Sequence, residues 1–378
     1  MRSRKSLAVV TALVVAAAAA AAAFAGGSAN AKAIGCEGLP IGFMGPITGP
    51  VAFLGNEQLH WAQFALDEFN RQQGTKFTLQ QVDTQLNPAL AQTGGTKLAA
   101  DKSVLITVGP AGSQEVQAVG RIFKKAGLAY ISASATAATL TNGTYPTFFR
   151  VVGSDTAQAR TDALFIRNKL KADNVFIVDD QESYSTGIAN EAQKILRSRG
   201  AKVTRESVNQ KVTDFSSLVS KIGGDVDVVF LPWQVAANAQ LFYEQMREQG
   251  KNARIFGSDG LDSGDFKAEG RYISSFARDI RGLPGTAGLI KRYEDRYDNK
   301  WGTFGPPTYV AMQAAVLAMK AACKNKTADR AEVLRSLRKV KVKRTLLGLP
   351  LSFAKNGENP SAKFYVYRFN GSKRTLVG

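Results

Sequence analysis

Short apolar segments alternate along the chain with longer segments in which apolar residues recur every three or four positions. The short segments are typical of buried strands in parallel sheets, whose two faces are both covered. Such strands are predicted at residues 39–44, 77–83, 104–108, 128–132, 148–152, 175–178, 226–231, 255–257 and 364–369.

The longer segments predict amphipathic helices between the strands. Asn87 followed by Pro88 is a strong helix start, because Asn caps a helix and Pro is well tolerated at its first position. Helices are predicted at residues 56–71, 188–199, 236–249, 285–297, 309–324 and 331–339. Two more are predicted to begin at residues 88 and 113. Repeated strand–helix units form parallel sheets with helices on both faces. The units run in two series, which predicts an α/β fold with two doubly wound parallel-sheet lobes.

The first 31 residues have the pattern of a signal peptide. Arg2, Arg4 and Lys5 precede an alanine-rich apolar stretch, and small residues follow up to Ala31. A membrane anchor is the alternative, but alanine is a weak membrane residue, and no later segment offers the roughly 20 apolar residues of a spanning helix. We therefore expect an exported protein of the periplasm or cell surface, cleaved near Ala31 and peripheral to the membrane.

The chain is strongly basic. Loss of the signal peptide lowers its formal net charge from +18 to +15. In the cytoplasm such a charge would suggest nucleic acid as a partner, but export argues against that class. The densest basic run, residues 339–344, is expected to be a solvated edge. The excess charge favours an anionic membrane or cell-wall surface.

Cys36 and Cys323 are the only cysteines. In an oxidising compartment an isolated pair suggests one disulfide. The alternative is a lipid anchor at Cys36, because residues 33–36 loosely resemble a lipidation box. However, this cysteine lies well past the apolar stretch, and alanine stands where leucine is usual.

The residue patterns of common enzyme and cofactor sites are missing. His60 is the only histidine, and neither a dinucleotide-binding nor a P-loop glycine motif occurs. One histidine and two distant cysteines make no metal-ligand cluster. Asp179, Asp180 and Glu182 could be catalytic carboxylates, but adjacent strand residues point to opposite faces, so a loop role is favoured. We expect no enzymatic activity, no cofactor and no metal.

In open parallel sheets, ligands bind at the carboxyl ends of the strands. The predicted strands are followed there by segments rich in Gly, Ser, Thr, Asp and aromatic residues, which suits a small polar ligand. These segments are 45–49, 109–113, 132–136, 179–184, 232–234 and 258–260.

Ser113 allows two interpretations. As a helix cap, it would accept hydrogen bonds from the amides of residues 114–116. As part of a binding site, its hydroxyl and the partly positive helix start would hold a carboxylate. Gly109 and Gly112 would then let the ligand approach the backbone closely.

Six segments occur in the order seen in the periplasmic leucine/isoleucine/valine-binding proteins: IGFMGPITGPVAFLGNEQLHWAQFALDEFN, VGPAGSQEVQAV, YISASATAATLT, FFRVVGSDTAQA, VFIVDDQESYSTGIA and IFGSDG. The chain resembles a type I substrate-binding protein of a branched-chain amino-acid ABC transporter. The resemblance implies a hinge of three crossovers, with one lobe at 33–152 plus 278–347 and the other at 153–277 plus 348–378. It also places Cys36 and Cys323 in one lobe, which makes a bridge between them reasonable.

The resemblance also implies a binding site. Ser113 and the small-small-threonine loop Ser134, Ala135 and Thr136 would hold an α-carboxylate. Asp259 would hold an α-ammonium from the other lobe, although the family usually has glutamate there.

The expected pocket wall departs from the family pattern. Tyr184 matches an aromatic wall position, Gln234 stands where leucine binders have tyrosine, with Trp233 beside it, and Leu54 replaces an aromatic residue. The implied ligand is an amino acid or a related small carboxylate, with aromatic or amide compounds as alternatives.

The implied role is delivery to the permease and ATPase subunits of an ABC transporter, by a monomer. The alternative is a sensory module of the same fold that signals to a receptor.

Overall fold

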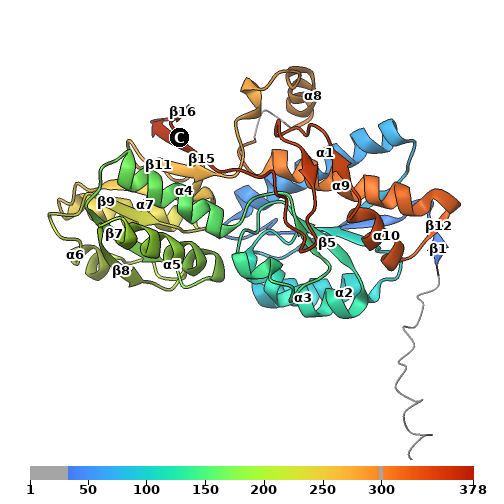
Figure 1. Cartoon of the computed structure of the whole chain (residues 1–378), viewed down its shortest axis with the longest axis horizontal. Coiled ribbons are helices and arrows are strands. Elements are labelled where there is room, and N and C mark those ends of the chain that lie inside the picture. The colour runs from blue at the N-terminus through green and yellow to red at the C-terminus, as the bar shows by residue number, and fades with distance from the viewer. Residues whose placement is uncertain (1–32, 298–300) are drawn as a thin grey trace, which may run out of the picture. The chain divides into compact units, whose positions relative to one another are not determined.

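Residues 33–297 and 301–378 are described by the computed structural model of the chain (Figure 1). The predicted signal peptide, residues 1–31, lies outside these ranges. Within them strands alternate with helices, as the apolar pattern predicts, and the strands form two large sheets. The α/β fold with two doubly wound sheets is therefore confirmed.

The first sheet consists of β2 (Pro40–Gly45), β3 (Thr78–Asp83), β4 (Ile106–Val108), β5 (Ala129–Ser132) and β6 (Phe148–Arg150). The strands are parallel and lie in the order β3-β2-β4-β5-β6. Each of them falls on a segment predicted to be a strand. Because all run in one direction, their carboxyl ends meet at one edge of the sheet.

Helices cover both faces of the first sheet. They are α1 (Ala52–Gln73), α2 (Pro88–Ala100), α3 (Ser113–Ala126), α8 (Ala287–Tyr297), α9 (Gly305–Ala322) and α10 (Arg330–Leu337). α1, α9 and α10 share one apolar core with the sheet, whereas α2 and α3 share another on the opposite face. Asn87 caps α2, with Pro88 as the first helical residue, as predicted. α8 packs against α1, where Tyr293 stacks on Trp61 with ring centroids 4.0 Å apart.

The second sheet contains β7 (Asn174–Asp179), β8 (Lys202–Ser207), β9 (Val228–Leu231), β10 (Arg254–Gly257), β11 (Tyr272–Ser275), β15 (Tyr365–Asn370) and β16 (Lys373–Leu376). Their order is β16-β15-β11-β10-β9-β7-β8. The strands from β7 to β11 are parallel, and β15 and β16 extend the sheet as antiparallel strands.

Two further pairs of helices cover the second sheet. α4 (Asp155–Asn168) and α5 (Ser183–Ser198) pack on one face, and α6 (Ser216–Ser220) and α7 (Ala236–Glu248) pack on the other. Figure 1 shows α4 and α5 beside each other, with α5 near β7 and β8 and α4 near β11 and β15. Both sheets belong to one compact unit, Ile34–Gly378.

Five elements of the second sheet and its covering helices have no counterpart in the apolar pattern: α4, α6, β8, β11 and β16. α4 is missed because its buried side includes the polar residues Gln158 and Asp162. β8 is an edge strand in which only Val203 is fully buried, so it lacks a continuous apolar run. β11 is half serine, and its serines are nevertheless buried.

The chain passes between the two sheets three times. The connections are residues 151–154, between β6 and α4; residues 276–286, between β11 and α8; and residues 353–364, between β14 (Leu351–Ser352) and β15. The limits predicted for the two lobes stay a prediction. β14 pairs with β13 (Lys341–Val342), and Leu351 belongs to the core of the first sheet.

A disulfide joins Cys36 to Cys323, as the resemblance implies, with the Cα atoms 5.9 Å apart. It lies beside a short ladder formed by β1 (Ile34–Gly35) and β12 (Thr327–Ala328). Because the Cys36 sulfur is in the bridge, it cannot also carry a lipid. Across residues 33–297 and 301–378, no helix is both long enough and apolar enough to cross a membrane.

Candidate ligand-binding site

Ser113 connects two strand exits of the first sheet. It is the first residue of α3, and Gly112 is the N-cap. The Ser113 hydroxyl accepts a hydrogen bond from the Ala137 amide at 3.0 Å, so it does not cap its own helix. The capping interpretation is therefore wrong. Because the Ser113 oxygen accepts from Ala137, its hydroxyl hydrogen remains available to an anion.

The loop after β5 is held by its carbonyl groups. The carbonyls of Ala135 and Ala137 accept hydrogen bonds from Arg150 Nη1, at 3.4 and 2.9 Å, and the Thr136 carbonyl accepts one from the Asp155 amide at 2.7 Å. The Thr136 amide has no acceptor among the described residues. Its hydroxyl lies near the Asp155 carboxylate without reaching hydrogen-bond geometry. Thr136 thus offers a free amide and a hydroxyl at one point.

Ser134 differs from its neighbours in this loop. Its hydroxyl donates to the Ala111 carbonyl at 2.9 Å and accepts from Gln58 Nε2 at 3.0 Å. Both capacities are therefore used within the protein. This arrangement assigns Ser134 to joining the loops after β4 and β5.

The two glycines near Ser113 are explained by packing. A Cβ atom on Gly109 would lie 2.1 Å from the Met44 carbonyl oxygen, and Gly109 has a φ of +101°. A Cβ on Gly112 would lie 2.7 Å from a methyl group of Leu86. The close approach that these glycines permit is therefore to the protein's own atoms.

Asp259 lies on the short turn η2 (Asp259–Leu261) that follows β10, and it is buried. Its Oδ1 accepts hydrogen bonds from the Tyr184 hydroxyl at 2.9 Å and from Gln158 Nε2. No side chain among the described residues donates to Oδ2. Burial raises the pKa of the Asp259 carboxyl to about 7. Tyr184, expected as an aromatic wall, thus also orients this carboxylate.

Asp155 is a further candidate residue that the sequence analysis did not name. It begins α4 and is 1% exposed, and neither carboxylate oxygen has a hydrogen-bond partner among the described residues. Burial raises its pKa to about 8, while Thr136 and Arg150 act in the opposite direction and Asp259 adds to the rise.

A signal for this side of the site is present in the sequence. Asp155, Gln158 and Asp162 are spaced to lie on one face of a helix. All three are buried in the structure. Burial also raises the pKa of Asp162 well above its ordinary value. A polar stripe on the buried side of a helix therefore marks the acidic side of the site.

Asp155→Asn should stabilise the fold at alkaline pH. The unfolded carboxyl ionises near its ordinary pKa of 3.8, whereas the folded one holds its proton up to about pH 8. Stability is therefore lost as pH rises between these values, because only the folded state retains the proton. Asparagine removes this penalty, so we expect a gain of about 1 kcal/mol or more at pH 8 and a much smaller gain at pH 4.

Urea unfolding of the variant and wild type at both pH values measures this effect. Asp265→Asn, at an exposed position, is the matched control and should change little at either pH. An equal effect of Asp155→Asn at pH 4 and pH 8 would contradict the assignment of a costly buried carboxylate.

A direct hydrogen bond joins the exits of the two sheets. Gln114 Nε2 donates to Gln234 Oε1 at 3.0 Å, and both side chains are buried. Gly260 packs under the second exit, because a Cβ atom there would lie 3.0 Å from the Gln234 Cα atom. Gln234 is therefore next to Asp259 in space as well as next to Gln114.

An apolar contact accompanies this hydrogen bond. Val51 and Leu86 from the first sheet's exits and Val235 from the second form one small buried cluster. The strand exits of the two sheets thus face each other. The residues that lie at or contact these exits include Ser113, Thr136, Asp155, Tyr184, Asp259, Gln234 and Gln114, all of them buried.

The profile of the family described as periplasmic binding protein matches residues 38–374. The chain belongs to the periplasmic binding protein family. A curated relative, the leucine-, isoleucine-, valine-, threonine- and alanine-binding protein of Pseudomonas aeruginosa, is 29% identical over 316 residues, covering 80% of this chain and 84% of that protein. The Leu/Ile/Val-binding protein homolog 1 of Brucella melitensis is 29% identical, with 91% and 92% covered.

Solved structures show the same similarity. The branched-chain amino acid transporter substrate-binding protein LivJ of Streptococcus pneumoniae, in complex with isoleucine, has a TM-score of 0.81 at 25% identity. The match covers 90% of this chain and 99% of that chain. A leucine-binding protein LivK of Thermotoga maritima has a TM-score of 0.82 at 20% identity, which supports the fold.

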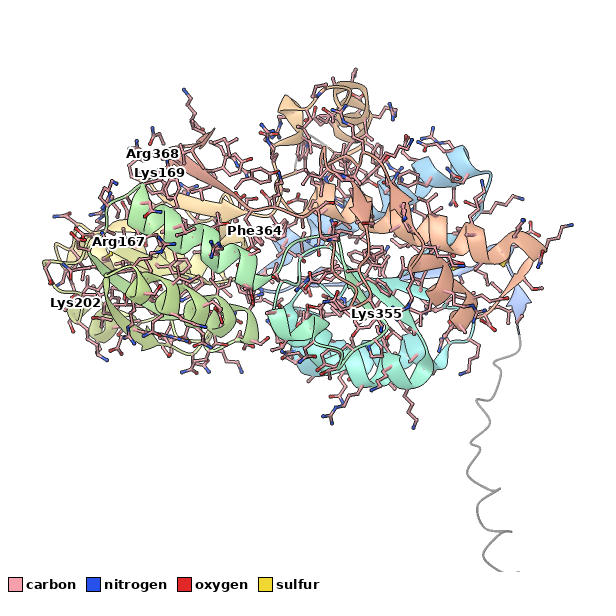
Figure 2. The ribbon with its side chains drawn as sticks, in the orientation of Figure 1. Arg167, Lys169, Lys202, Lys355, Phe364 and Arg368 are labelled. Carbon is pink, nitrogen blue, oxygen red and sulfur yellow. A yellow bond between two sulfur atoms is a disulfide. The ribbon has the colours of Figure 1, made fainter. Side chains whose placement is uncertain are left out.

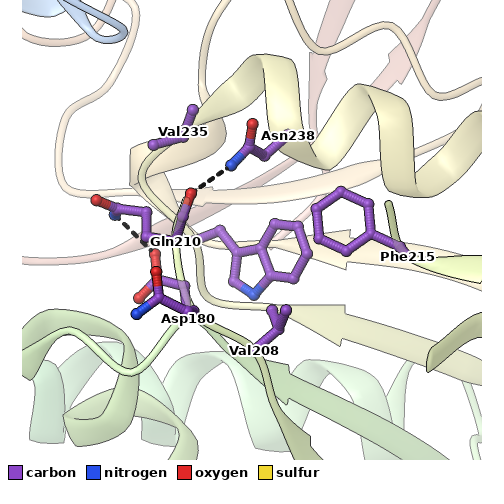
Figure 3. Close-up of a pocket in the computed structure, with 8 residues that line it drawn as sticks. Asp180, Val208, Gln210, Phe215, Val235 and Asn238 are labelled. Carbon is purple, nitrogen blue, oxygen red and sulfur yellow. Dashed lines mark hydrogen bonds between the residues drawn. The ribbon is translucent and has the colours of Figure 1, made fainter. Parts of the chain in front are cut away.

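Two predicted wall residues of this periplasmic binding protein lie in apolar cores. Leu54 is buried in the core of the first sheet. Trp233 is buried in the core of the second, where its Nε1 donates to the Val178 carbonyl at 2.7 Å. Val208 and Phe215, labelled in Figure 3, line a small pocket together with Trp233. This pocket has no room for a water molecule. We therefore assign the Trp233 indole to packing.

The residues considered as catalytic or metal-binding groups in the sequence analysis make contacts within the protein. Asp179 forms an ion pair with Arg205 at 2.8 Å, and Asp180 accepts a hydrogen bond from Gln210 at 3.0 Å (Figure 3). These contacts agree with the loop role predicted for this segment. His60 stacks on Tyr297, with ring centroids 4.6 Å apart. The described part of this binding protein contains no group of three or more His, Cys, Asp or Glu residues that could hold a metal ion.

Proposed function

We propose that this protein binds an α-amino acid between the strand exits of its two sheets and delivers it to an ABC transporter. The observation that carries the proposal is that hydrogen-bond donors without acceptors and buried carboxylates occur together at the facing strand exits. Ser113 and Thr136 offer hydrogen-bond donors on the first sheet's side, and Asp155 and Asp259 offer carboxylates on the other. An amino-acid zwitterion has the complementary charges at the matching ends.

The carboxylate end of the ligand would lie at the start of α3. The Ser113 hydroxyl hydrogen and the Thr136 amide and hydroxyl are the donors that the loops leave available. The helix start adds a partial positive charge, which favours an anion at this position. No arginine or lysine is needed to neutralise it.

The ammonium end would lie between Asp259 and Asp155. Tyr184 and Gln158 hold Oδ1 of Asp259, so Oδ2 can accept from the ligand. The positive charge of an ammonium would favour the ionised form of both buried acids and lower their pKa. Aspartate here is shorter than the family's usual glutamate, and Asp155 supplies a second carboxylate.

The ligand side chain would be met by a polar wall. Gln114 and Gln234, hydrogen-bonded to each other across the two exits, would form this wall, and Gln114 Oε1 is buried with no hydrogen-bond donor among the described residues. The curated relatives are named for binding Leu, Ile and Val, and one of them also for Thr and Ala. We propose small uncharged amino acids as the ligand class, with threonine and alanine at least as good as leucine.

Export and delivery complete the proposal. The signal peptide ending near Ala31 would direct the chain out of the cytoplasm, where its disulfide can form. The mature protein would act as a monomer at the membrane surface and hand its ligand to permease and ATPase subunits. The relatives' names and the LivJ structure support this role.

Binding of an amino acid should strengthen as pH rises from 6 to 8. Below their pKa values of about 7 and about 8, Asp259 and Asp155 hold protons that an ammonium must displace. Calorimetry in buffers of different ionisation enthalpy should show release of roughly one proton near pH 7.

The ligand itself is found first by a thermal-shift screen of amino acids and of carboxylates that lack an amine.

Acids without an amine serve as the control in the same experiment. If one of them binds best and with no proton release, the ligand has no ammonium, and the amino-acid proposal is wrong.

A further inference from the structure

Arg150, at the end of β6, lies directly behind the loop that contains Thr136. Its side chain is 0% exposed. Nη1 donates to the carbonyls of Ala135 and Ala137, which flank Thr136, and Nη2 donates to the Thr141 hydroxyl at 3.2 Å. One guanidinium therefore fixes the orientation of the peptide groups on both sides of Thr136, the candidate hydrogen-bond donor to the ligand's carboxylate.

Glu358 is the ionic partner of this arginine. Its two oxygens accept hydrogen bonds from Arg150 Nε, at 3.0 Å, and from Nη2. Glu358 also accepts from the Thr141 hydroxyl at 2.5 Å. A forked guanidinium–carboxylate pair of this kind is more restrictive in direction than a pair formed by lysine.

Glu358 lies on the third connection between the sheets. This connection also touches the first one: Asn359 Nδ2 donates to the Val151 carbonyl at 2.8 Å, and a Cβ atom on Gly153 would lie 2.6 Å from the ring of Phe364. Figure 2 labels Phe364 and Lys355, which belong to this third connection. The Arg150–Glu358 pair thus joins the loop of Thr136 to two of the three connections.

We propose that Arg150 and Glu358 form a positioning pair that holds the Thr136 loop in its ligand-binding orientation and ties it to the segments connecting the two sheets. The inference rests on the proposed function, because the ligand is what the loop is oriented to receive. Neither residue needs to touch the ligand. Their role is to keep the Thr136 amide and hydroxyl directed at the space between the sheets.

Physical reasons favour this role over simple core packing. Without Arg150, the carbonyls of Ala135 and Ala137 would be buried without donors, and the loop would rotate to satisfy them. Such a rotation turns the Thr136 amide away from the site. The same loop also holds Ser113, through the Ala137 amide, so both carboxylate donors depend on its orientation.

The test compares ligand affinity in variants of the pair with affinity in a matched control. Arg150→Gln should weaken binding of the best amino acid at least about tenfold, the factor that corresponds to one lost hydrogen bond to a charged group. Glu358→Gln, at a partly exposed position, should weaken it less. Arg330 is the control, because it is also buried and also donates to backbone carbonyls, those of Val104 and Ala99 among them. Arg330→Gln should lower stability and leave affinity unchanged.

The pH profile of affinity separates positioning from a general loss of structure. The groups that act on the charge of Asp155 are Arg150, Glu358, Asp259, Asp162 and Tyr184. Arg150 lowers the pKa of Asp155 and Glu358 raises it. Arg150→Gln should therefore move the midpoint of the profile to higher pH and Glu358→Gln to lower pH. Arg150→Lys keeps the charge but loses the fork, so it should weaken binding with an unchanged midpoint.

Two outcomes would overturn the inference. One is wild-type affinity in Arg150→Lys and Glu358→Gln, both of which keep a polar or charged group and should fold even if Arg150→Gln does not. The other is an equal loss of affinity in Arg330→Gln. If the wild-type protein binds no amino acid at all, it is the proposed function that fails, before any variant is compared.

Discussion

Asp259→Ala is expected to weaken binding of the amino-acid ligand by about 2–5 kcal/mol, the range for removing one partner of a buried charge pair. The ligand's ammonium would remain in a space that keeps only Asp155 as a counter-charge. Burial makes this loss large, because water cannot replace the missing carboxylate. Isothermal calorimetry at pH 8, where both acids ionise most readily, measures the effect most directly.

The control for this prediction is another buried acid at a strand exit of the same sheet. Asp180 follows β7, accepts a hydrogen bond from Gln210 (Figure 3) and lies close to the backbone amide of Gln234, but it is not among the groups proposed to hold the ammonium. Asp180→Asn should leave affinity within about twofold of wild type, as expected for a residue that makes no ligand contact. Equal affinity of Asp259→Ala and wild type would contradict the assignment of Asp259 to the ammonium.

Replacing both Cys36 and Cys323 by serine is expected to lower the free energy of unfolding by about 3–5 kcal/mol. The bridge spans a sequence separation of 287 residues, so its removal frees a very long loop in the unfolded chain. Urea unfolding of the variant and of the reduced wild-type protein should give similar losses.

Ligand affinity should be nearly unchanged in the folded double-serine variant. Cys36 precedes β2 and Cys323 follows α9, which places the bridge at the end of the first sheet opposite its strand exits. A large loss of affinity with little loss of stability would show that the bridge shapes the site instead. A stability loss well under 1 kcal/mol would contradict the loop-closure argument.

Most of the first sheet could be predicted from the sequence because its strands, apart from the polar edge strand β3, are short apolar runs. Residues 39–44 and 128–132 are examples, and each coincides closely with a strand of the structure. The start of α2 could be predicted as well, because the Asn87 cap bonds to amides only two and three residues further along the chain. Local patterns of this kind are decided by neighbours in the chain.

The hydrogen bond of Ser113 could not be predicted in this way. A serine before a helix normally bonds to the next few amides, but this one bonds to Ala137, 24 residues further along the chain. The pairing depends on β4 and β5 being neighbours in the sheet. Local rules contain no information about such a contact.

The acidic side of the site was found only in part for a related reason. Asp259 came from resemblance to a family motif, whereas Asp155 and Gln158 belong to a helix that the apolar pattern did not reveal. Their buried side is polar, and burial of polar groups in a helix is unusual unless partners are supplied from elsewhere. For Gln158 those partners are Asp259 and Ser274, on other elements.

The buried carboxylates of α4 also determine how this protein would respond to artificial selection. A library screened only for heat resistance at alkaline pH would enrich asparagine at positions 155 and 162, because the neutral side chain avoids ionisation in the interior. Survivors with asparagine at position 155 would fold better and, on the proposed function, would capture their solute poorly. A consensus or computational redesign scored on folding energy would make the same exchange, so a stabilising campaign on this scaffold has to hold position 155 fixed.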